Sequence, residues 1–178
     1  MFEIADRFET PFTIDPEVTP RDNGDRSPLD ISASPDGLRR LIAVQSRRAL
    51  KGNGGKDAIE REGDTVTGAG APEMHCGAGS GGIAVDPYGN VFPCVQWRRP
   101  VGNLHERSLV EIWRRDEKLD EIRRVTTEAK HLVESWEGTL TGFCPGVAEM
   151  LTGDPLAVPE NTATRSSILA ELPLHPVP

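Results

Sequence analysis

The fold is decided by residues 75–113, which read HCGAGSGGIAVDPYGNVFPCVQWRRPVGNLHERSLVEIW. Within them, Ile83 and Val85 alternate with small or polar neighbours, a pattern typical of a half-buried strand. Residues 86–90, DPYGN, supply a turn, because proline fixes its own φ and both glycine and asparagine tolerate a positive φ. Residues 91–92 then resume an apolar run. The stretch therefore predicts a β-hairpin of two short strands joined by a tight turn.

Two of the three cysteines of the chain flank this hairpin: Cys76 precedes the first strand and Cys94 lies near the end of the second. A thiolate pair held on a rigid hairpin can supply half of the ligands of a metal or iron–sulfur site. The third cysteine is Cys144. Three cysteines in a reducing compartment favour metal ligation or buried thiols over a disulfide framework.

Two helices are predicted around the hairpin. Ser34, with Pro35 behind it, is a good helix start, and Gly52 is a natural stop. Ser108 can cap a second helix over roughly residues 108–133. The apolar stripe of this second helix predicts core packing, and it consists of Leu109, Ile112, Trp113, Leu119, Ile122 and Val125.

The hairpin segment resembles the opening of a SPASM domain, the C-terminal extension of many radical S-adenosylmethionine (radical SAM) enzymes that modify peptides. That family opens with a cysteine, a gap and then Gly-x4-Cys, and here Cys76 is followed by twelve residues before the Gly89-to-Cys94 motif. Residues 102–104, GNL, and the pair Ile112-Trp113 also resemble the way those domains continue. The resemblance implies an auxiliary iron–sulfur or peptide-binding module.

The chain departs from the family in its cysteines. The catalytic Cys-x3-Cys-x2-Cys motif is absent from the 178 residues, so we expect no S-adenosylmethionine site here and no catalysis by this chain alone. The family's second block runs Cys-x2-Cys-x5-Cys-x3-Cys, and aligning it on Cys144 places three other residue types at its remaining positions, namely Ser135, Gly138 and Ala148. In the family pattern Cys76 and Cys94 would ligate one cluster and Cys144 another, which leaves both ligand sets incomplete.

The candidate metal ligands are therefore Cys76, Cys94, Cys144 and His75, because the imidazole of a histidine is an accepted ligand of zinc and of Rieske-type iron. Three interpretations stay open. The chain can hold an iron–sulfur cluster with an incomplete set of its own ligands. It can instead be a small zinc-stabilised domain that uses Cys76, Cys94 and His75. It can also be a metal-free binding or adaptor domain in which each cysteine is an ordinary buried thiol.

The resemblance and the composition together divide the chain into four parts. Residues 1–52 are expected to be a remnant of the C-terminal part of a radical SAM barrel, because TPRDNGD at residues 19–25 resembles the link after its last strands; a polar surface loop explains that wording equally well. Residues 53–73 are rich in glycine and charge and predict a flexible linker. Residues 74–155 form the SPASM-like domain, and the proline-rich residues 156–178 predict an irregular tail.

The expected fold class is α+β, with an antiparallel β-hairpin packed on one long helix, preceded by the barrel fragment and followed by the irregular tail. A net charge of −8 argues against a nucleic-acid binder, since phosphate contacts require a basic surface. Most arginine pairs lie on predicted helices beside acidic residues and predict a solvated face. No apolar run is long enough to span a membrane and residues 1–10 are acidic, which predicts a cytoplasmic protein. By resemblance its partners would be a catalytic radical SAM subunit and a peptide substrate.

Overall fold

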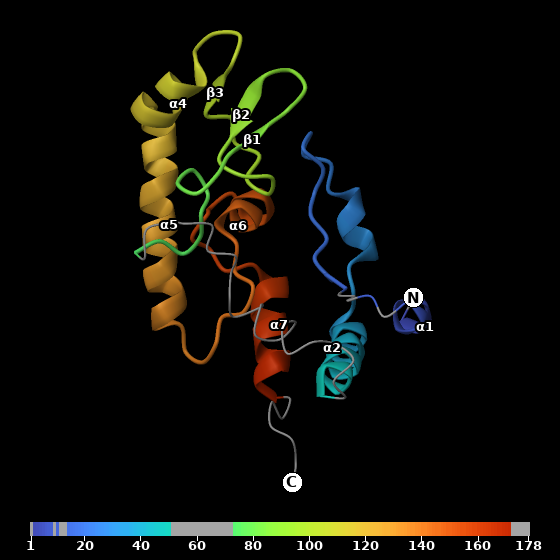
Figure 1. Ribbon diagram of the computed structural model, residues 1–178. Coiled ribbons are helices and arrows are strands. Elements are labelled where there is room, and N and C mark those ends of the chain that lie inside the picture. The colour runs from blue at the N-terminus through green and yellow to red at the C-terminus, as the bar shows by residue number, and fades with distance from the viewer. Residues whose placement is uncertain (1, 9, 11–13, 51–72, 172–178) are drawn as a thin grey trace.

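The structure is a computed structural model that describes residues 2–8, 10, 14–50 and 73–171 (Figure 1). The structure combines helices with a small antiparallel sheet at one end of the molecule, which confirms the α+β fold class. In chain order the elements are helix α1 (Phe2–Arg7), the 3-10 helix η1 (Ser27–Ile31), helix α2 (Pro35–Leu50), strands β1 (Ala84–Val85), β2 (Asn90–Phe92) and β3 (Gly102–Asn103), and helices α4 (Leu109–Arg115), α5 (Glu117–Ser135), α6 (Pro145–Thr152) and α7 (Glu160–Glu171).

The predicted hairpin is present as β1 and β2, with Ala84 paired to Phe92. At its turn, Asp86 Oδ1 accepts hydrogen bonds from the backbone amides of Tyr88 and Asn90, both at 2.9 Å. Gly89 has a φ of +80°, the left-handed conformation that favours glycine. The turn chemistry read from DPYGN is therefore confirmed.

A third strand, β3, pairs with β2 and completes a sheet of order β1-β2-β3. Its Asn103 side chain donates to the Tyr88 carbonyl at 3.1 Å and to Asn90 Oδ1 at 3.0 Å, so it ties the new strand to the hairpin turn. The sequence analysis predicted only the two-stranded hairpin. Strand β3 is only two residues long, which is too short to show the alternation of apolar and polar residues that predicts a strand.

The single long helix expected over residues 108–133 is wrong, because the structure divides it into α4 and α5 at Asp116. Ser108 does cap α4, in a reciprocal capping box with Glu111. Asp116 has an extended backbone, with φ −95° and ψ 118°, and its Oδ1 accepts from the Lys118 amide at 3.0 Å to cap α5. The break also leaves Leu109 45% exposed, outside the core that its place in the stripe predicted.

The irregular tail expected over residues 156–178 is also wrong for its described part. Residues 160–171 form helix α7, although the segment has a weak apolar pattern. Ile168 is 1% exposed and packs with Leu38 and Ile42 of α2, so contacts distant in the sequence stabilise this helix. Residues 172–178 lie outside the described part.

Helix α2 begins at Pro35 as predicted, whereas the stop expected at Gly52 lies outside the described residues. The described parts of residues 1–50 consist of α1, η1, α2 and irregular backbone, and Ile14 does not lie in a strand. The origin of this region in a radical SAM barrel stays a prediction. The predicted linker at residues 53–73 falls almost wholly outside the described residues.

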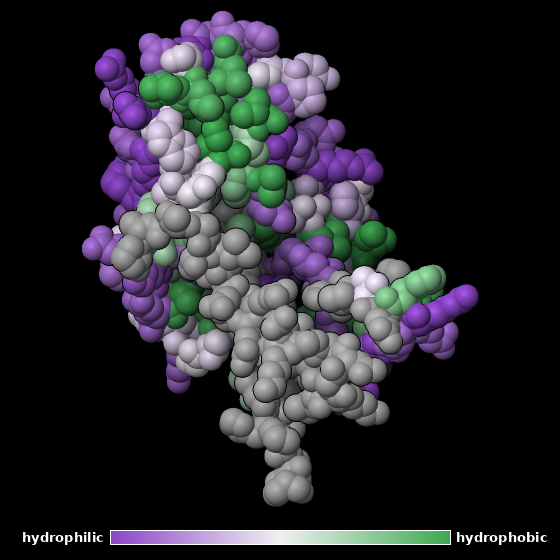
Figure 2. Space-filling model, in the orientation of Figure 1, coloured by the Kyte–Doolittle hydropathy of each residue, from purple (hydrophilic) through white to green (hydrophobic). Residues whose placement is uncertain are grey.

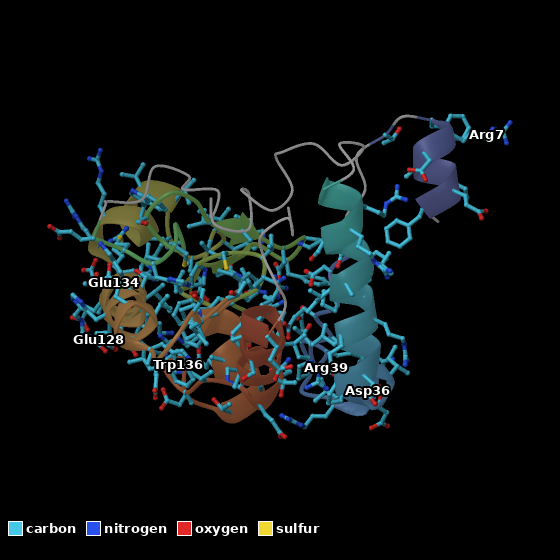
Figure 3. All side chains as sticks on the ribbon, turned by 90° about the horizontal axis from the view of Figure 1, so that it is seen from below. Arg7, Asp36, Arg39, Glu128, Glu134 and Trp136 are labelled. Atoms are coloured by element: carbon cyan, nitrogen blue, oxygen red, sulfur yellow. The ribbon has the colours of Figure 1, made fainter. Side chains whose placement is uncertain are left out.

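The buried apolar side chains form three cores. The hairpin core joins the sheet to α4 and α5, and it contains Ala78, Val91, Trp97, Val101, Ile112, Leu119 and Ile122. The α5–α6 core contains Ala129, Leu140, Phe143 and Ala148. The α2–α7 core contains Leu38, Ile42 and Ile168. Beside this last core, Arg39 Nη2 of α2 lies 3.5 Å from Glu171 Oε2 of α7, and Figure 3 shows Arg39 between the two helices.

The surface is apolar in places at the end that carries the sheet and α4 (Figure 2). Exposed apolar residues of these elements and the following loop include Val85, Leu104 and Val110. Within the described residues, no helix has the length and apolar character needed to cross a membrane.

Candidate metal centre

The three cysteines come from three separate elements. Cys76 opens the glycine-rich loop before β1, Cys94 follows β2, and Cys144 holds the N-cap position of α6. All three are half-buried free thiols.

Contacts between their immediate neighbours show that these three elements meet. His75 Nε2 lies 2.8 Å from the Phe143 carbonyl oxygen, which links the residues just before Cys76 and Cys144. The Gly79 amide donates to the Pro93 carbonyl at 2.9 Å, which links the Cys76 loop to the residue before Cys94. A third link, between the start of α6 and the turn after Cys94, closes a triangle of contacts around the thiols.

That third link is a close approach of α6 to the turn after Cys94. A Cβ atom built on Gly146 would lie 2.8 Å from Trp97 Cβ and 2.9 Å from Trp97 Cα. Glycine therefore allows the start of α6, two residues after Cys144, to rest directly on the backbone three residues after Cys94. Trp97 is 1% exposed and belongs to the hairpin core, so this contact is firmly packed.

The electrostatics of the thiols agree with this convergence. Burial raises the pKa of Cys76, the Ala78 amide opposes the rise, and the neighbouring Cys94 adds to it. Burial likewise raises the pKa of Cys144, against the Val147 amide. Both Cys94 and Cys76 raise the pKa of Cys144 further. Negative charge on Cys76 and Cys94 would thus disfavour ionisation of Cys144, and a bound cationic group would relieve that repulsion.

His75 sits beside the thiols, but its ring is already engaged. Its Nε2 faces the Phe143 carbonyl oxygen, which can only accept, so Nε2 carries the proton and donates. The imidazole also packs at 5.8 Å, centroid to centroid, against the Phe143 ring. His75 thus holds the Cys76 and Cys144 elements together, and only its Nδ1 keeps a lone pair for other partners.

The loop after Cys76 is fixed by an arginine that the sequence analysis placed on a solvated face. Arg123 Nε of α5 donates to the Gly79 carbonyl at 2.8 Å, and its Nη2 donates to the Trp113 carbonyl at 2.8 Å. A Cβ atom on Gly79, whose φ is +67°, would lie 2.8 Å from Leu119 Cδ1, so the loop packs tightly on the same helix. The missed signal was the position of Arg123, one residue from the buried Ile122.

The donor set fits part of an iron–sulfur site. Three convergent thiols are soft ligands of the type that such clusters use, and they account for three of the usual four positions. Ser80, in the loop after Cys76, has a buried hydroxyl with no hydrogen-bond partner among the described residues. Among the described residues, no group of three or more His, Cys, Asp or Glu side chains could hold a metal ion as it stands.

Residues 76–137 match the family model for SPASM, an iron–sulfur cluster-binding domain. The match begins at Cys76, includes Cys94 and the whole sheet, and ends before Cys144. No curated protein and no solved structure matches the chain. The resemblance to a SPASM-type domain drawn from the sequence is confirmed over residues 76–137.

Proposed function

We propose that Cys76, Cys94 and Cys144 together ligate one iron–sulfur cluster, and that the chain serves as an auxiliary iron–sulfur module. The observation that carries this proposal is the triangle of contacts between the neighbours of the three cysteines, His75 to Phe143, Gly79 to Pro93 and Trp97 to Gly146. Each contact joins two of the three elements, so the three contacts together hold the cysteine-bearing segments against one another.

This assignment differs from the division that the family pattern suggested, in which Cys144 served a second cluster. Both Cys94 and Cys76 raise the pKa of Cys144. The positions aligned with the rest of its cysteine block hold Ser135, Gly138 and Ala148, which cannot supply thiolates. Ser135 and Gly138 are both exposed, and Ala148 belongs to the α5–α6 core. The proposal therefore uses all three cysteines in a single site.

We propose an iron–sulfur cluster at this site rather than a zinc ion. Thiolates that bind one zinc ion at about 2.3 Å must bring their sulfurs within about 4 Å of one another. Iron–sulfur clusters place several irons and sulfides between the thiolates and so hold them further apart. The match of residues 76–137 to an iron–sulfur cluster-binding domain supports the cluster over the single ion.

When bound, a cluster with three protein thiolates would supply a redox centre with one iron open to an outside ligand. The chain's own residues would bury the site, hold its loops through Arg123 and His75, and direct backbone amides such as that of Ala78 at the sulfurs. Amides of this kind stabilise thiolate over thiol. The 178 residues carry no Cys-x3-Cys-x2-Cys motif, so we propose that a separate catalytic radical SAM subunit acts on a peptide beside this module.

The test is the iron and acid-labile sulfide content of the full chain, reconstituted anaerobically, beside three variants. We expect iron and sulfide in roughly equal amounts in the parent protein. Cys76→Ser and Cys144→Ser should lose most of both. His75→Gln should keep both, because a glutamine amide can still donate to the Phe143 carbonyl.

The same variants separate the alternatives. Stoichiometric zinc without sulfide, lost in His75→Gln and kept in Cys144→Ser, would establish the zinc-stabilised domain instead. A parent protein that binds neither iron nor zinc after reconstitution would leave the metal-free adaptor as the better account. Equal cluster content in Cys144→Ser and the parent would return Cys144 to a purely structural role.

A further inference from the structure

A cavity of about 220 Å³ lies where residues 20–26 meet the turn after Cys94 and the start of α6. Four arginines line it, namely Arg21, Arg26, Arg98 and Arg99. Only two carboxylates, those of Asp22 and Glu149, line it with them. The lining therefore carries two positive charges in excess, four against two, in a chain whose net charge is −8.

Most of these charges already have partners. Arg98 Nη2 lies 3.0 Å from Asp22 Oδ2, and Arg21 Nη1 lies 2.6 Å from an oxygen of Asp25 outside the lining. Glu149 receives a hydrogen bond from Trp97 Nε1, and its other oxygen lies 3.4 Å from Arg99 Nη1. The two acids of the cavity are thus occupied by specific neighbours.

Arg26 differs from the other arginines. Within the described residues its guanidinium makes one contact, a hydrogen bond of 3.3 Å from Nη1 to the Leu151 carbonyl. No described carboxylate pairs with it. Its positive charge therefore faces the cavity without an anion to balance it.

Arg99 contributes a second observation. Its Nη1 contacts Glu121 and Glu149, but its Nε and Nη2 are buried and have no hydrogen-bond partner within the described part of the chain. Buried guanidinium donors without an acceptor are costly and rare in folded proteins. Arg99 also lines the cavity, so its charge adds to that of Arg26 there.

We propose that this cavity binds the oxyanion of a ligand, a carboxylate or a phosphate, with Arg26 as its principal donor and Arg99 adding positive charge to its wall. The planar guanidinium fork matches both groups, because it can donate two parallel hydrogen bonds to their oxygens. The oxyanion belongs either to a small free molecule or to an acidic peptide, and the chemistry at the arginines is the same. The proposal stands without the iron–sulfur cluster.

The cavity nevertheless adjoins the cysteine elements. Trp97 and Gly146, which both line it, follow Cys94 and Cys144 by three and two residues. Trp97 and Gly146 contact each other directly, so the turns that follow Cys94 and Cys144 form part of the cavity wall. An anion bound here would therefore contact the same backbone that positions two of the thiols.

The test is isothermal titration of the full chain at low ionic strength with inorganic phosphate, with acetate and with a tetraglutamate peptide. Arg26→Gln should weaken binding at least about tenfold, which corresponds to about 1.4 kcal/mol. Asp22→Asn should tighten binding, because it removes a competing carboxylate. Arg114→Gln is the matched control, since it removes one exposed arginine of α4 outside the cavity, and it should bind like the parent.

The three ligands identify the source of the oxyanion. Tighter binding of the peptide than of phosphate and acetate, lost in Arg26→Gln, supports a peptide carboxylate; tighter binding of phosphate supports a small free anion. Absence of saturable binding by all three would overturn the proposal. Equal weakening in Arg26→Gln and Arg114→Gln would also overturn it, because it would show only a general charge attraction.

Discussion

At the scale of single residues, the close contact between Gly146 and Trp97 is the most exacting feature of the candidate centre. Alanine in a helix is ordinarily more stable than glycine, by about 0.5–1 kcal/mol. Here the added Cβ would lie 2.9 Å from the Trp97 backbone, which cannot move away cheaply. We expect Gly146→Ala to lower the free energy of unfolding by about 1–3 kcal/mol in urea melts, and to lower cluster content.

Gly82→Ala is the control, because it adds the same atom where nothing lies within 4 Å. Its free energy of unfolding should stay within about 0.5 kcal/mol of the parent. If Gly146→Ala were as stable as Gly82→Ala, the Cys94 and Cys144 elements would not be held together by this contact.

The carboxyl of Glu17 gives a pH dependence. Burial raises its pKa above the ordinary 4.5, against the opposing effects of Arg165 and Asn161. The folded state then binds this proton more tightly than the unfolded state, so the contribution of Glu17 to stability falls as pH rises through the window just above 4.5. In urea melts over a range of roughly pH 4 to 7, Glu17→Gln should lack that fall. The exposed Glu160→Gln should retain it, and a rise in the parent relative to Glu17→Gln would contradict the assignment.

At the scale of elements, the break between α4 and α5 depends on Asp116. Its side chain is 7% exposed, one oxygen caps α5 through the Lys118 amide, and the other contacts Arg107. Asp116→Ala removes both interactions and should cost roughly 2–3 kcal/mol of unfolding free energy. Ser108→Ala removes only the cap of α4 and should cost about 1 kcal/mol. Chemical denaturation of both variants checks the order, and a larger loss in Ser108→Ala would contradict it.

The same elements show what local sequence can predict. The hairpin turn and the starts of α2 and α4 rest on residues that act on their own neighbours, such as Gly89 and Ser108, and all were predicted. Helix α7 was not, because Ile168 is buried against α2, more than a hundred residues away. The break at Asp116 was missed although its signal is local: aspartate is a favoured N-cap residue, and here it accepts from the Lys118 amide. The apolar stripe continues on both sides of Asp116, with Ile112 before it and Leu119 after it, and this continuity predicted one helix.

At the scale of the molecule, the candidate centre combines both kinds of information. Cys76 and Cys94 were recognisable from their spacing around one hairpin. The place of Cys144 was not, because it depends on how α6 packs against Trp97 and on the His75–Phe143 contact. The cavity arginines were missed for the same reason, since Arg26 and Arg99 are brought together only by the fold.

The α2–α7 core is the apolar link between the N-terminal helices and the cysteine-bearing region, because Leu38 and Ile42 of α2 pack on Ile168 of α7. Polar links between the two regions include the contacts of Arg98 with Asp22 and of Arg165 with Glu17. Ile168→Ala should cost about 2–5 kcal/mol locally. In hydrogen exchange, the amides of α2 should then exchange much faster while those of α5 keep their protection.

Ile122→Ala is the reciprocal control, since Ile122 is fully buried in the hairpin core rather than in the α2–α7 core. It should speed exchange in α5 and in the sheet while changing α2 little. Selective loss in each variant would show that two cooperative units meet at α7, so that a partner or ligand could move residues 14–50 without dismantling the cysteine triangle. Equal loss of protection in α2 and α5 with Ile168→Ala would instead mean that the chain unfolds as one unit, and that the cavity between them is as rigid as the cores.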